Sequence, residues 1–443
     1  MERVNPTTIL TKCLRLQDNK IFIKTDKVSL NLDLNMFKKV RVIGVGKASA
    51  KMALGIEHIL GSVIDGGTIV TKQGHTESLQ RINVIEASHP IPDSSSVHAA
   101  NIITSECKKA GEETLIINLV SGGGSALLSS PFQSNEIDSY KYLNLKLCHK
   151  QETTRALLAS GATIHELNCV RKHLSSLKGG RMAKEIYPAT SVNLILSDVV
   201  GNQLDTIASG ITVPDTTSFN DAAEILHKYS LWESIPPEVR KLIEAGINGI
   251  VEDTPKYGHS AFTKTHNILI GTGEMAINAA ADAAREMGFL TKIVSVEVTG
   301  ESREVGKDFF TLAQKTKAEN PSLKQPICII AAGETTVTVN GKGKGGRCQE
   351  MALAFLNESI HDSNLSKFIS FLPAGTDGND GPTDAAGAFS DPIAIEQNKI
   401  SGLDPHQSLM DNDSYTFFSD CNSLFKPGAT NTNVADVFIL IIR

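Results

Sequence analysis

Short runs of aliphatic and β-branched residues alternate along the first half of the chain with longer stretches in which apolar residues recur every three or four positions. Such runs predict buried strands, and such spacing predicts amphipathic helices. The expected helices cover residues 48–60, 97–110 and 153–160. The expected strands cover residues 40–45, 68–71, 82–87, 115–120 and 192–196. Because this alternation is typical of a mostly parallel sheet with helices on both faces, we expect an α/β domain.

The second half repeats the pattern after a weaker stretch. Residues 219–266, interrupted by prolines around the only tryptophan, are expected to form a connector with two modest helices. The alternating segment 335–340, followed by a glycine-rich turn, predicts a hairpin arm and hence a mixed second sheet. We therefore expect two α/β domains, over residues 1–255 (with the connector from about 219) and 256–443. The remaining predicted elements cover residues 267–270, 274–287, 292–296, 303–317, 327–331 and 349–356.

Composition and charge narrow the classes of function. Hydrophobic residues make up 41% and charged residues 21% of the 443 positions, as in ordinary globular proteins. The net charge of −6 gives no general attraction to nucleic acid or to an anionic membrane, so we expect neither as a partner. The seven cysteines show no CxxC spacing, and residues 1–20 contain no apolar run of signal-peptide length. These features favour a cytoplasmic protein.

The first of several glycine clusters, Gly44-Val45-Gly46-Lys47-Ala48-Ser49, comes where a predicted strand ends and a helix begins. Amide groups at a helix start attract phosphate or carboxylate, and Lys47 adds a full positive charge. The alternative is a tight turn whose glycines serve packing alone. The next strand ends in Thr71-Lys72, without the acidic residue that binds a dinucleotide ribose, which disfavours a nicotinamide cofactor.

A second cluster, Ser121 to Ser125, carries three consecutive glycines between hydroxyl groups after the most apolar strand. Such a loop can bind a phosphate through its amides, although a merely flexible loop is the alternative. His89, in a loop stiffened by two prolines, is a candidate for acid–base chemistry or for a substrate hydrogen bond, but many such histidines are structural.

Positive charge then gathers between residues 168 and 181, where Arg171 and Lys178 are candidates for binding an anionic small molecule. At helical spacing some of these side chains need not share a face. Asp198 follows directly after a predicted strand, where α/β sheets place ligands and metal ions. We expect either a Mg²⁺ ligand or a helix cap at this position.

The second half holds two further clusters. Residues 341–347 combine glycines with Lys342, Lys344 and Arg347, which suits polyphosphate, and Arg347 at a helix start can neutralise charge during phosphoryl transfer. A solvated basic hairpin is the alternative for the lysines. Residues 373–384, around Asp377 and Gly378, lack the register of an EF-hand but remain a phosphate-binding or metal-binding candidate beside a simple turn.

Motifs spread over nearly the full length give the chain a specific resemblance to the class II (MOFRL-type) glycerate kinases. The segments that carry it are GVGKAS from Gly44, SHPIPD from Ser88, SGGGSALL from Ser121, NCVRKHLSSLKGGR from Asn168, LSDVVGN from Leu196, AAGETTVTV from Ala331, GGRCQEMAL from Gly345, AGTDGNDGPTDAAGA from Ala374 and NTNVAD from Asn431. The C-terminus departs from the family by stopping at Arg443, straight after an apolar strand.

The resemblance implies ATP-dependent phosphorylation of D-glycerate to 2-phosphoglycerate with Mg²⁺. It places the reaction in a cleft between a Rossmann-like N-terminal domain and a mixed α/β C-terminal domain, with the family's essential lysine at Lys47 and its essential arginine at Arg347. We expect nucleotide contacts from Ser121, Gly122, Gly123, Gly124, Ser125, Glu334, Gly345 and Gly346. We expect substrate contacts from His89, Arg171, Lys178, Asp377 and Gly378, and a metal ligand in Asp198.

Two other classes of function compete with a kinase. The literal GxGxxG match in residues 341–346 and the Gly271-Thr272-Gly273 turn would suit a nicotinamide-dependent hydroxypyruvate or hydroxy-acid oxidoreductase. A sensor of nucleotides or sugar phosphates could use the same loops without turnover. From the residues alone the chain is a two-domain enzyme acting on phosphate, as a monomer or a homodimer.

Overall fold

The computed structural model describes residues 4–134 and 143–443, which form two compact units. The N-terminal unit comprises Pro6–Leu196 and Asn202–Ile270, and the C-terminal unit comprises Gly271–Arg443 together with Ser197–Gly201 and residues 4–5. The two units are described separately. No helix in the described part of the chain is long and apolar enough to cross a membrane.

The core of the N-terminal unit is a six-stranded sheet of order β6-β5-β4-β7-β8-β9, in which each neighbouring pair from β6 to β8 is parallel. Every residue of the central strand β7 is buried, as its apolar sequence predicts. The predicted strands of the first half are therefore confirmed. Their observed bounds are β4 Lys39–Val45, β5 Gly67–Lys72, β6 Ile82–Ala87, β7 Thr114–Val120, β8 Thr190–Leu196 and β9 Thr265–Gly271.

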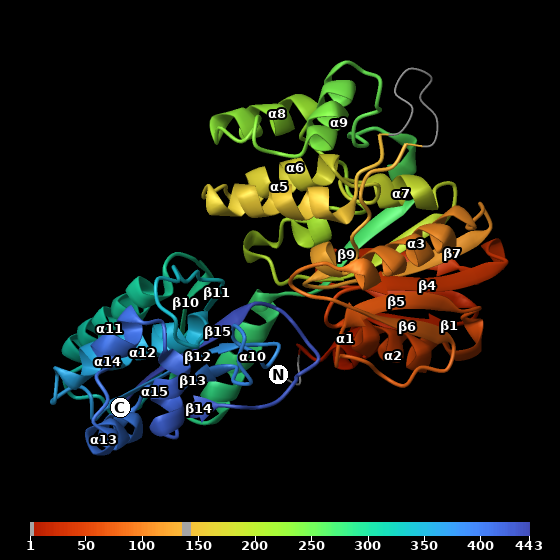
Figure 1. Ribbon diagram of the computed structural model, residues 1–443. Helices are drawn as coiled ribbons and strands as arrows, with labels where there is room; N and C mark the ends of the chain where they lie inside the picture. The colour runs from red at the N-terminus through yellow and green to blue at the C-terminus, as the bar shows by residue number, and fades with distance from the viewer. Residues whose placement is uncertain (1–3, 135–142) are drawn as a thin grey trace. The chain divides into compact units, whose positions relative to one another are not determined.

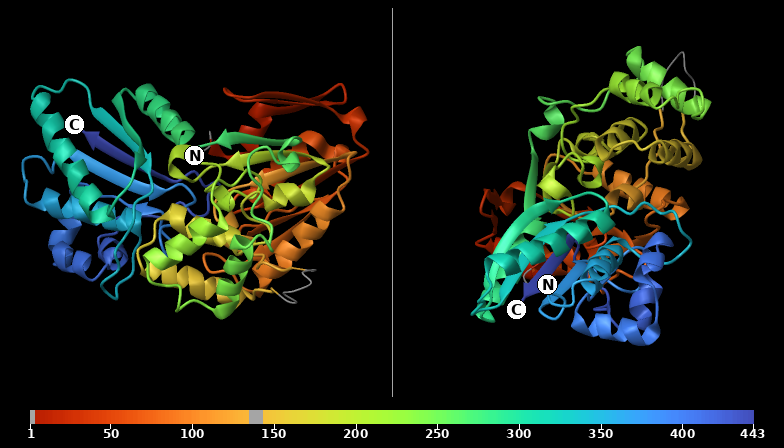
Figure 2. Two further views of the ribbon diagram at one scale, coloured as in Figure 1. Left: turned by 90° about the horizontal axis from the view of Figure 1, so that it is seen from above. Right: turned by 90° about the vertical axis from the view of Figure 1, so that its left-hand side faces the viewer.

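Helices cover both faces of this sheet, with α1 and α2 on one side and α3 and α7 on the other (Figures 1 and 2). A separate three-stranded antiparallel sheet, which the sequence pattern did not predict, precedes β4 and consists of β1 Leu14–Gln17, β2 Lys20–Lys24 and β3 Ser29–Asp33. The helices are α1 Pro6–Cys13, α2 Ser49–Leu60, α3 Ser94–Lys108, α4 Gly124–Leu127, α5 Leu147–Ala159, α6 Ile164–His173, α7 Arg181–Ile186, α8 Phe219–Lys228 and α9 Pro237–Ile247.

The expected connector from residue 219 is instead an ordered helical layer. Helices α8 and α9 lie over α5 and α6 (Figure 1) and share a core with them that includes Phe219, Leu226 and Leu242. Both helices carry a strong apolar stripe, which the prolines around them obscured in the sequence. This layer fixes α6 and the turn that follows it, which carry Arg171 and Lys178.

The C-terminal unit contains a mixed six-stranded sheet of order β10-β11-β15-β12-β13-β14. Strands β10 and β11 are parallel, whereas β15 runs antiparallel to both β11 and β12. The prediction of a mixed sheet is confirmed. The strands are β10 Leu290–Val298, β11 Ile327–Gly333, β12 Ile369–Gly375, β13 Gly387–Ala388, β14 Leu424–Phe425 and β15 Asp436–Ile442.

Alternate residues of β11 and β15 bury opposite faces of this sheet. Ile329 and Phe438 pack with α11 and α12, and Ile330 and Ile439 pack with α10. Stacked phenylalanines, among them Phe371, fill the first of these cores. The helices are α10 Gly273–Glu286, α11 Ser302–Glu319, α12 Arg347–Ile360, α13 Pro392–Ser401, α14 Pro405–Met410 and α15 Ser414–Asp420.

Two sequence predictions differ from this architecture. The hairpin arm predicted over residues 335–340 is wrong, because these residues form only an isolated bridge between Thr336 and Glu301, and the amides of Asn340 and Gly341 donate to the Asn412 side chain. The boundary between the units lies after Ile270 rather than after residue 255, since β9 extends the first sheet beside β8. A strand's sequence shows that it is buried, but not which sheet it joins.

Candidate active site

The loop that joins β4 to α2 packs directly against the loop that follows β7. Lys47 N donates to Gly122 O (2.9 Å), Ala48 N to Ser121 Oγ (3.1 Å) and Ser49 N to Gly46 O (3.2 Å). A Cβ on Gly46, which has a φ of +135°, would meet Ser121 Oγ at 2.1 Å. These three amides are thus satisfied within the protein, so the loop offers an anion the Lys47 side chain rather than the amide cradle that its sequence suggested.

Lys47, His89 and Gly123 come together in the N-terminal unit. A Cβ built on Gly123, whose φ is +83°, would lie 3.0 Å from His89 Cδ2 and 3.4 Å from Lys47 Cγ. His89 precedes a cis proline, Pro90, and both Lys47 and His89 are partly buried. Three residues that the sequence singled out independently therefore form one cluster. A glycine is required at position 123 because any side chain would displace the lysine or the histidine.

The other end of the same loop rests on buried polar groups. Ser125 Oγ lies 2.7 Å from Ser209 Oγ, which in turn donates to Asn168 Oδ1 (3.0 Å). Ser209 and its neighbour Ala208 are buried and have φ values of +57° and +50°. Non-glycine residues in this region are strained, and such strain concentrates at functional sites. These buried hydrogen bonds hold the Ser125 end of the loop in place.

The basic segment between residues 168 and 181 separates into two groups. Lys172 pairs with Asp215 (3.1 Å), and Arg181 donates to the carbonyls of Lys172 and Ser175, so both cations have structural partners. Lys178 Nζ donates to Ser125 O (2.9 Å), which places it beneath the 121–125 loop. Arg171 makes no ion pair with any carboxylate among residues 4–134 and 143–443.

In the C-terminal unit, Arg347 at the start of α12 is held by two carboxylates. Its Nε and Nη2 donate to the two oxygens of Asp436 (2.6 and 3.1 Å), and its Nη1 donates to Glu334 (2.6 Å). Although burial acts in the opposite direction, Asp436 and Glu334 raise the pKa of Arg347 above its usual range. Asp436 is only 2% exposed, whereas the Glu334 side chain is 47% exposed. Asp436 therefore fixes the guanidinium, and Glu334 is the displaceable partner.

The glycines before Arg347 pack against side chains of the same unit. A Cβ on Gly346 would meet Asp380 Cγ at 2.3 Å, and one on Gly345 would meet Ser414 Oγ at 2.3 Å. Asp380 accepts hydrogen bonds from Cys348 N (3.1 Å) and Gln349 N (2.8 Å), so it caps α12. The structure gives Gly345 and Gly346 a packing role, and their contact with a nucleotide stays a prediction.

Replacing Asp380 by Ala is expected to destabilise the C-terminal unit. The loss of a buried helix cap and of its hydrogen bonds costs about 2 kcal/mol, which lowers Tm by about 4 to 8 °C. Thermal unfolding followed by circular dichroism measures the change. The matched control is Asp404→Ala, which removes the exposed cap of α14 (2.9 Å to His406 N) and should shift Tm much less. Equal Tm values for the two variants would contradict this account.

Asp377, Gly378 and Asp198 lie in loops of the C-terminal unit. Asp377 Oδ1 accepts from Asn379 N (3.0 Å), and Gly378 has a φ of +90° with no room for a Cβ beside Gly428 O (2.1 Å). Asp198 Oδ2 accepts from Asn433 Nδ2 (2.8 Å). The described residues contain no group of three side chains placed to hold a metal by themselves. Mg²⁺ commonly takes only one or two carboxylates along with phosphate oxygens, and Asp198 as a single carboxylate fits that chemistry.

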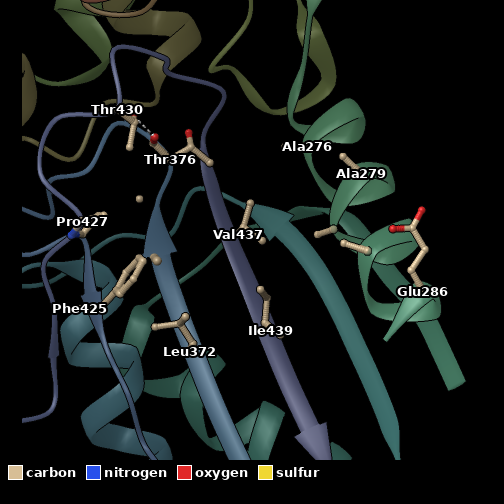
Figure 3. Close-up of a pocket in the computed structure, with 14 residues that line it drawn as sticks. Ala276, Ala279, Glu286, Leu372, Thr376, Phe425, Pro427, Thr430, Val437 and Ile439 are labelled. Carbon is tan, nitrogen blue, oxygen red and sulfur yellow. Dashed lines mark hydrogen bonds between the residues drawn. The ribbon is translucent and has the colours of Figure 1, made fainter. Parts of the chain in front are cut away.

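An apolar groove of about 370 Å³ lies beside α10 on one face of the C-terminal sheet. Figure 3 shows Val437 and Ile439 as its floor, between the alanines of α10 and the side chains of Leu372 and Phe425. The hydroxyl of Thr430 donates to Thr376 O at one end. Such a lining suits aliphatic or flat groups and offers no cation, so it is not a phosphoryl-transfer site.

Comparison with known proteins identifies the family. Residues 1–244 match a domain of unknown function (DUF4147), and residues 327–436 match the MOFRL family. The glycerate 2-kinase of Pyrococcus horikoshii is 38% identical over 100% of this chain and 94% of its own length. The crystal structure of glycerate kinase from Thermotoga maritima is 34% identical, covers 100% of this chain and 96% of that chain, and superposes with a TM-score of 0.80. The chain belongs to the class II glycerate kinase family.

Not every relative in this comparison is named a glycerate kinase. One relative from Agrobacterium vitis is named a hydroxypyruvate reductase. It is 38% identical over 90% of this chain and 98% of its own length. Family membership therefore fixes the architecture, and the relatives named glycerate kinase support glycerate phosphorylation over the reductase.

The structure groups the predicted site residues by unit. The N-terminal unit brings together Lys47, His89 and the 121–125 loop with Lys178, and the C-terminal unit brings together Arg347 and Glu334. Sequence reasoning missed Asp436, Ser209 and Lys150, which is a buried lysine of α5. Asp436 lies in the quoted NTNVAD motif and was open to recognition as an acidic residue at a strand start. Ser209 and Lys150 carried no comparable signal.

Proposed function

We propose that the protein transfers the γ-phosphoryl group of ATP to the 2-hydroxyl of D-glycerate. The observation that carries this proposal is the convergence of Lys47, His89 and the 121–125 loop in a member of the class II glycerate kinase family. A lysine beside a glycine loop suits direct phosphoryl transfer, in which positioning and charge neutralisation dominate.

Each residue has a distinct part in the proposed reaction. Lys47 neutralises charge on the transferring phosphoryl group, and His89 hydrogen-bonds the acceptor hydroxyl. Arg347 keeps its Nε and Nη2 on Asp436 while its Nη1 leaves the half-exposed Glu334 for a phosphate oxygen. Mg²⁺ carried by the nucleotide would neutralise the β- and γ-phosphates, with Asp198 and Asp377 as its candidate protein ligands.

The reaction is tested directly with purified protein, D-glycerate, ATP and Mg²⁺. ADP release gives the rate, and phosphorus NMR assigns the product. A 2-phosphoglycerate signal is the expected result. A 3-phosphoglycerate signal would retain the kinase but overturn the choice of hydroxyl, and no ADP above the background without glycerate would overturn the proposal.

A hydroxypyruvate reductase is the rival suggested by the names of two Agrobacterium vitis relatives. Strand β5 ends in Thr71-Lys72, so no carboxylate stands where a nicotinamide ribose is usually bound, and the amides of the β4–α2 loop are already occupied. We expect no oxidation of NADH or NADPH with hydroxypyruvate at 340 nm. A nucleotide sensor would instead bind ATP without glycerate-dependent turnover.

A further inference from the structure

Lys150 on α5 is a buried lysine that the proposed reaction has not used. It is only 7% exposed, and among residues 4–134 and 143–443 it has no carboxylate partner. Its one hydrogen bond runs from Nζ to Ser130 O at 3.5 Å. A buried ammonium group is costly unless it is paired, so an unpaired one needs a reason.

Two further cations without acidic partners lie close to Lys150. Lys178 is 1% exposed and its Nζ donates to the carbonyl of Ser125, and Arg171 on α6 is partly buried. Positive charge on Arg171 disfavours the charged forms of both lysines, which shows that the three groups interact. Their neighbour Lys172 forms ion pairs with Asp215 (3.1 Å) and Asp205 (3.7 Å). Among the described residues, Lys172 is thus paired with carboxylates, whereas Lys150, Lys178 and Arg171 are not.

The position of this cluster relative to Lys47 suggests which anion it takes. Lys178 lies under Ser125, and Lys47 contacts the same loop two residues away at Gly123. In glycerate, the carbon that carries the 2-hydroxyl also carries the carboxylate. A substrate whose acceptor oxygen lies near Lys47 therefore presents its carboxylate a short distance away, as the spacing along the loop requires.

We propose that Lys150 is a substrate-binding residue which, with Arg171 and Lys178, forms a three-cation site for the carboxylate of D-glycerate. This inference rests on the proposed kinase function and adds to it a residue and a pH dependence. The ligand is a carboxylate on a short hydroxy acid, and a phosphate group of the nucleotide is the competing occupant that the experiment must separate.

The cluster makes substrate affinity depend on pH. Burial, with Arg171 nearby, lowers the pKa of Lys150 to about 7 and that of Lys178 well below its ordinary value, and burial lowers the pKa of Arg171 to about 10. Glu238 of α9 pairs with His149 (3.8 Å) rather than with Lys150. Above pH 7 the free protein holds Lys150 neutral, and a bound carboxylate favours its charged form, so binding takes up a proton. Affinity therefore falls as the pH rises above about 7.

The decisive variant is Lys150→Met, compared with Lys146→Met, which alters an exposed lysine at the start of the same helix. At pH 7 we expect the KM for D-glycerate to rise at least tenfold in Lys150→Met, with the KM for ATP changed less than twofold. The wild-type KM for D-glycerate should rise between pH 7 and 9, and that of the variant should rise less, because only Lys178 and Arg171 remain to titrate. Lys146→Met should match the wild type throughout.

Thermal unfolding without ATP separates binding from folding and from catalysis. D-glycerate should raise the wild-type Tm, and this rise should vanish in Lys150→Met, whose own Tm at pH 6 should equal or exceed that of the wild type because an unpaired buried charge is gone. Inorganic phosphate is the second probe. If the wild type binds D-glycerate without phosphorylating it, and D-glycerate raises the Tm of the wild type but not that of Lys150→Met, the carboxylate site stands although the kinase proposal fails.

Three outcomes would overturn the proposal. One is an unchanged KM for D-glycerate in Lys150→Met. Another is an increase in the KM for ATP, or a loss of phosphate-induced rather than glycerate-induced stabilisation, which would assign the cluster to phosphate. The last is a lowered Tm with the D-glycerate shift retained, which would make Lys150 structural.

Discussion

Lys47→Ala is expected to lower kcat for glycerate phosphorylation by about a thousandfold or more. Phosphoryl transfer depends on preorganised charge at the transferring group, and removing one such group from an active site costs about this much. The Lys47 amide keeps its hydrogen bond to Gly122 O in this variant, so the loop and the fold should persist. Coupled ADP release at saturating substrates measures kcat, and Tm reports the fold.

Lys51→Ala is the matched control, because Lys51 lies four residues after Lys47, in the first turn of α2, and forms a partly buried pair with Glu77 (3.1 Å). We expect kcat for this control within twofold of the wild type. Lys47→Arg keeps the charge but is too bulky beside Gly123 and His89, so its rescue should be partial. A kcat for Lys47→Ala within about threefold of the wild type would remove Lys47 from the chemistry.

Most strands of the two six-stranded sheets were predictable because apolar runs of this length are typical of buried strands, whereas the two-residue strands β13 and β14 were not. Strand β7 is buried throughout, and its sequence Thr114–Val120 shows this directly. The order of strands was not predictable in the same way. Strand β9 follows the helical layer in the chain, yet it pairs beside β8, and β15 at the C-terminus inserts between β11 and β12. Such long-range pairings depend on packing that no local window contains.

The candidate site was predictable where its backbone conformation or close loop contacts require glycine, because these glycines can be seen in the sequence. The glycines at 46 and 123 stand at strand ends because the loops there touch, and this is visible as GVG and GGG. The function of the glycines was harder to infer, since those before Arg347 pack against Asp380 and Ser414. Lys150 could not be found at all, because its significance lies in the three-dimensional surroundings: within the described ranges 4–134 and 143–443 no carboxylate pairs with it.

Arg347→Met should abolish measurable turnover and also destabilise the C-terminal unit. Asp436 is 2% exposed and bonds Arg347 through both oxygens, so the variant leaves a buried carboxylate without its partner. Breaking a buried pair in this way costs about 3 to 5 kcal/mol. A low activity in this variant alone would therefore not separate a catalytic role from a structural one.

The double variant Arg347→Met/Asp436→Asn makes that separation. Its amide needs no counter-ion, so we expect Tm to recover most of the loss while kcat stays about a thousandfold or more below the wild type. Arg347→Lys, which keeps a charge but cannot bond both Asp436 oxygens and Glu334 at once, should have intermediate activity. If kcat recovers along with Tm in the double variant, Arg347 serves the fold alone and the charge for phosphoryl transfer comes from elsewhere.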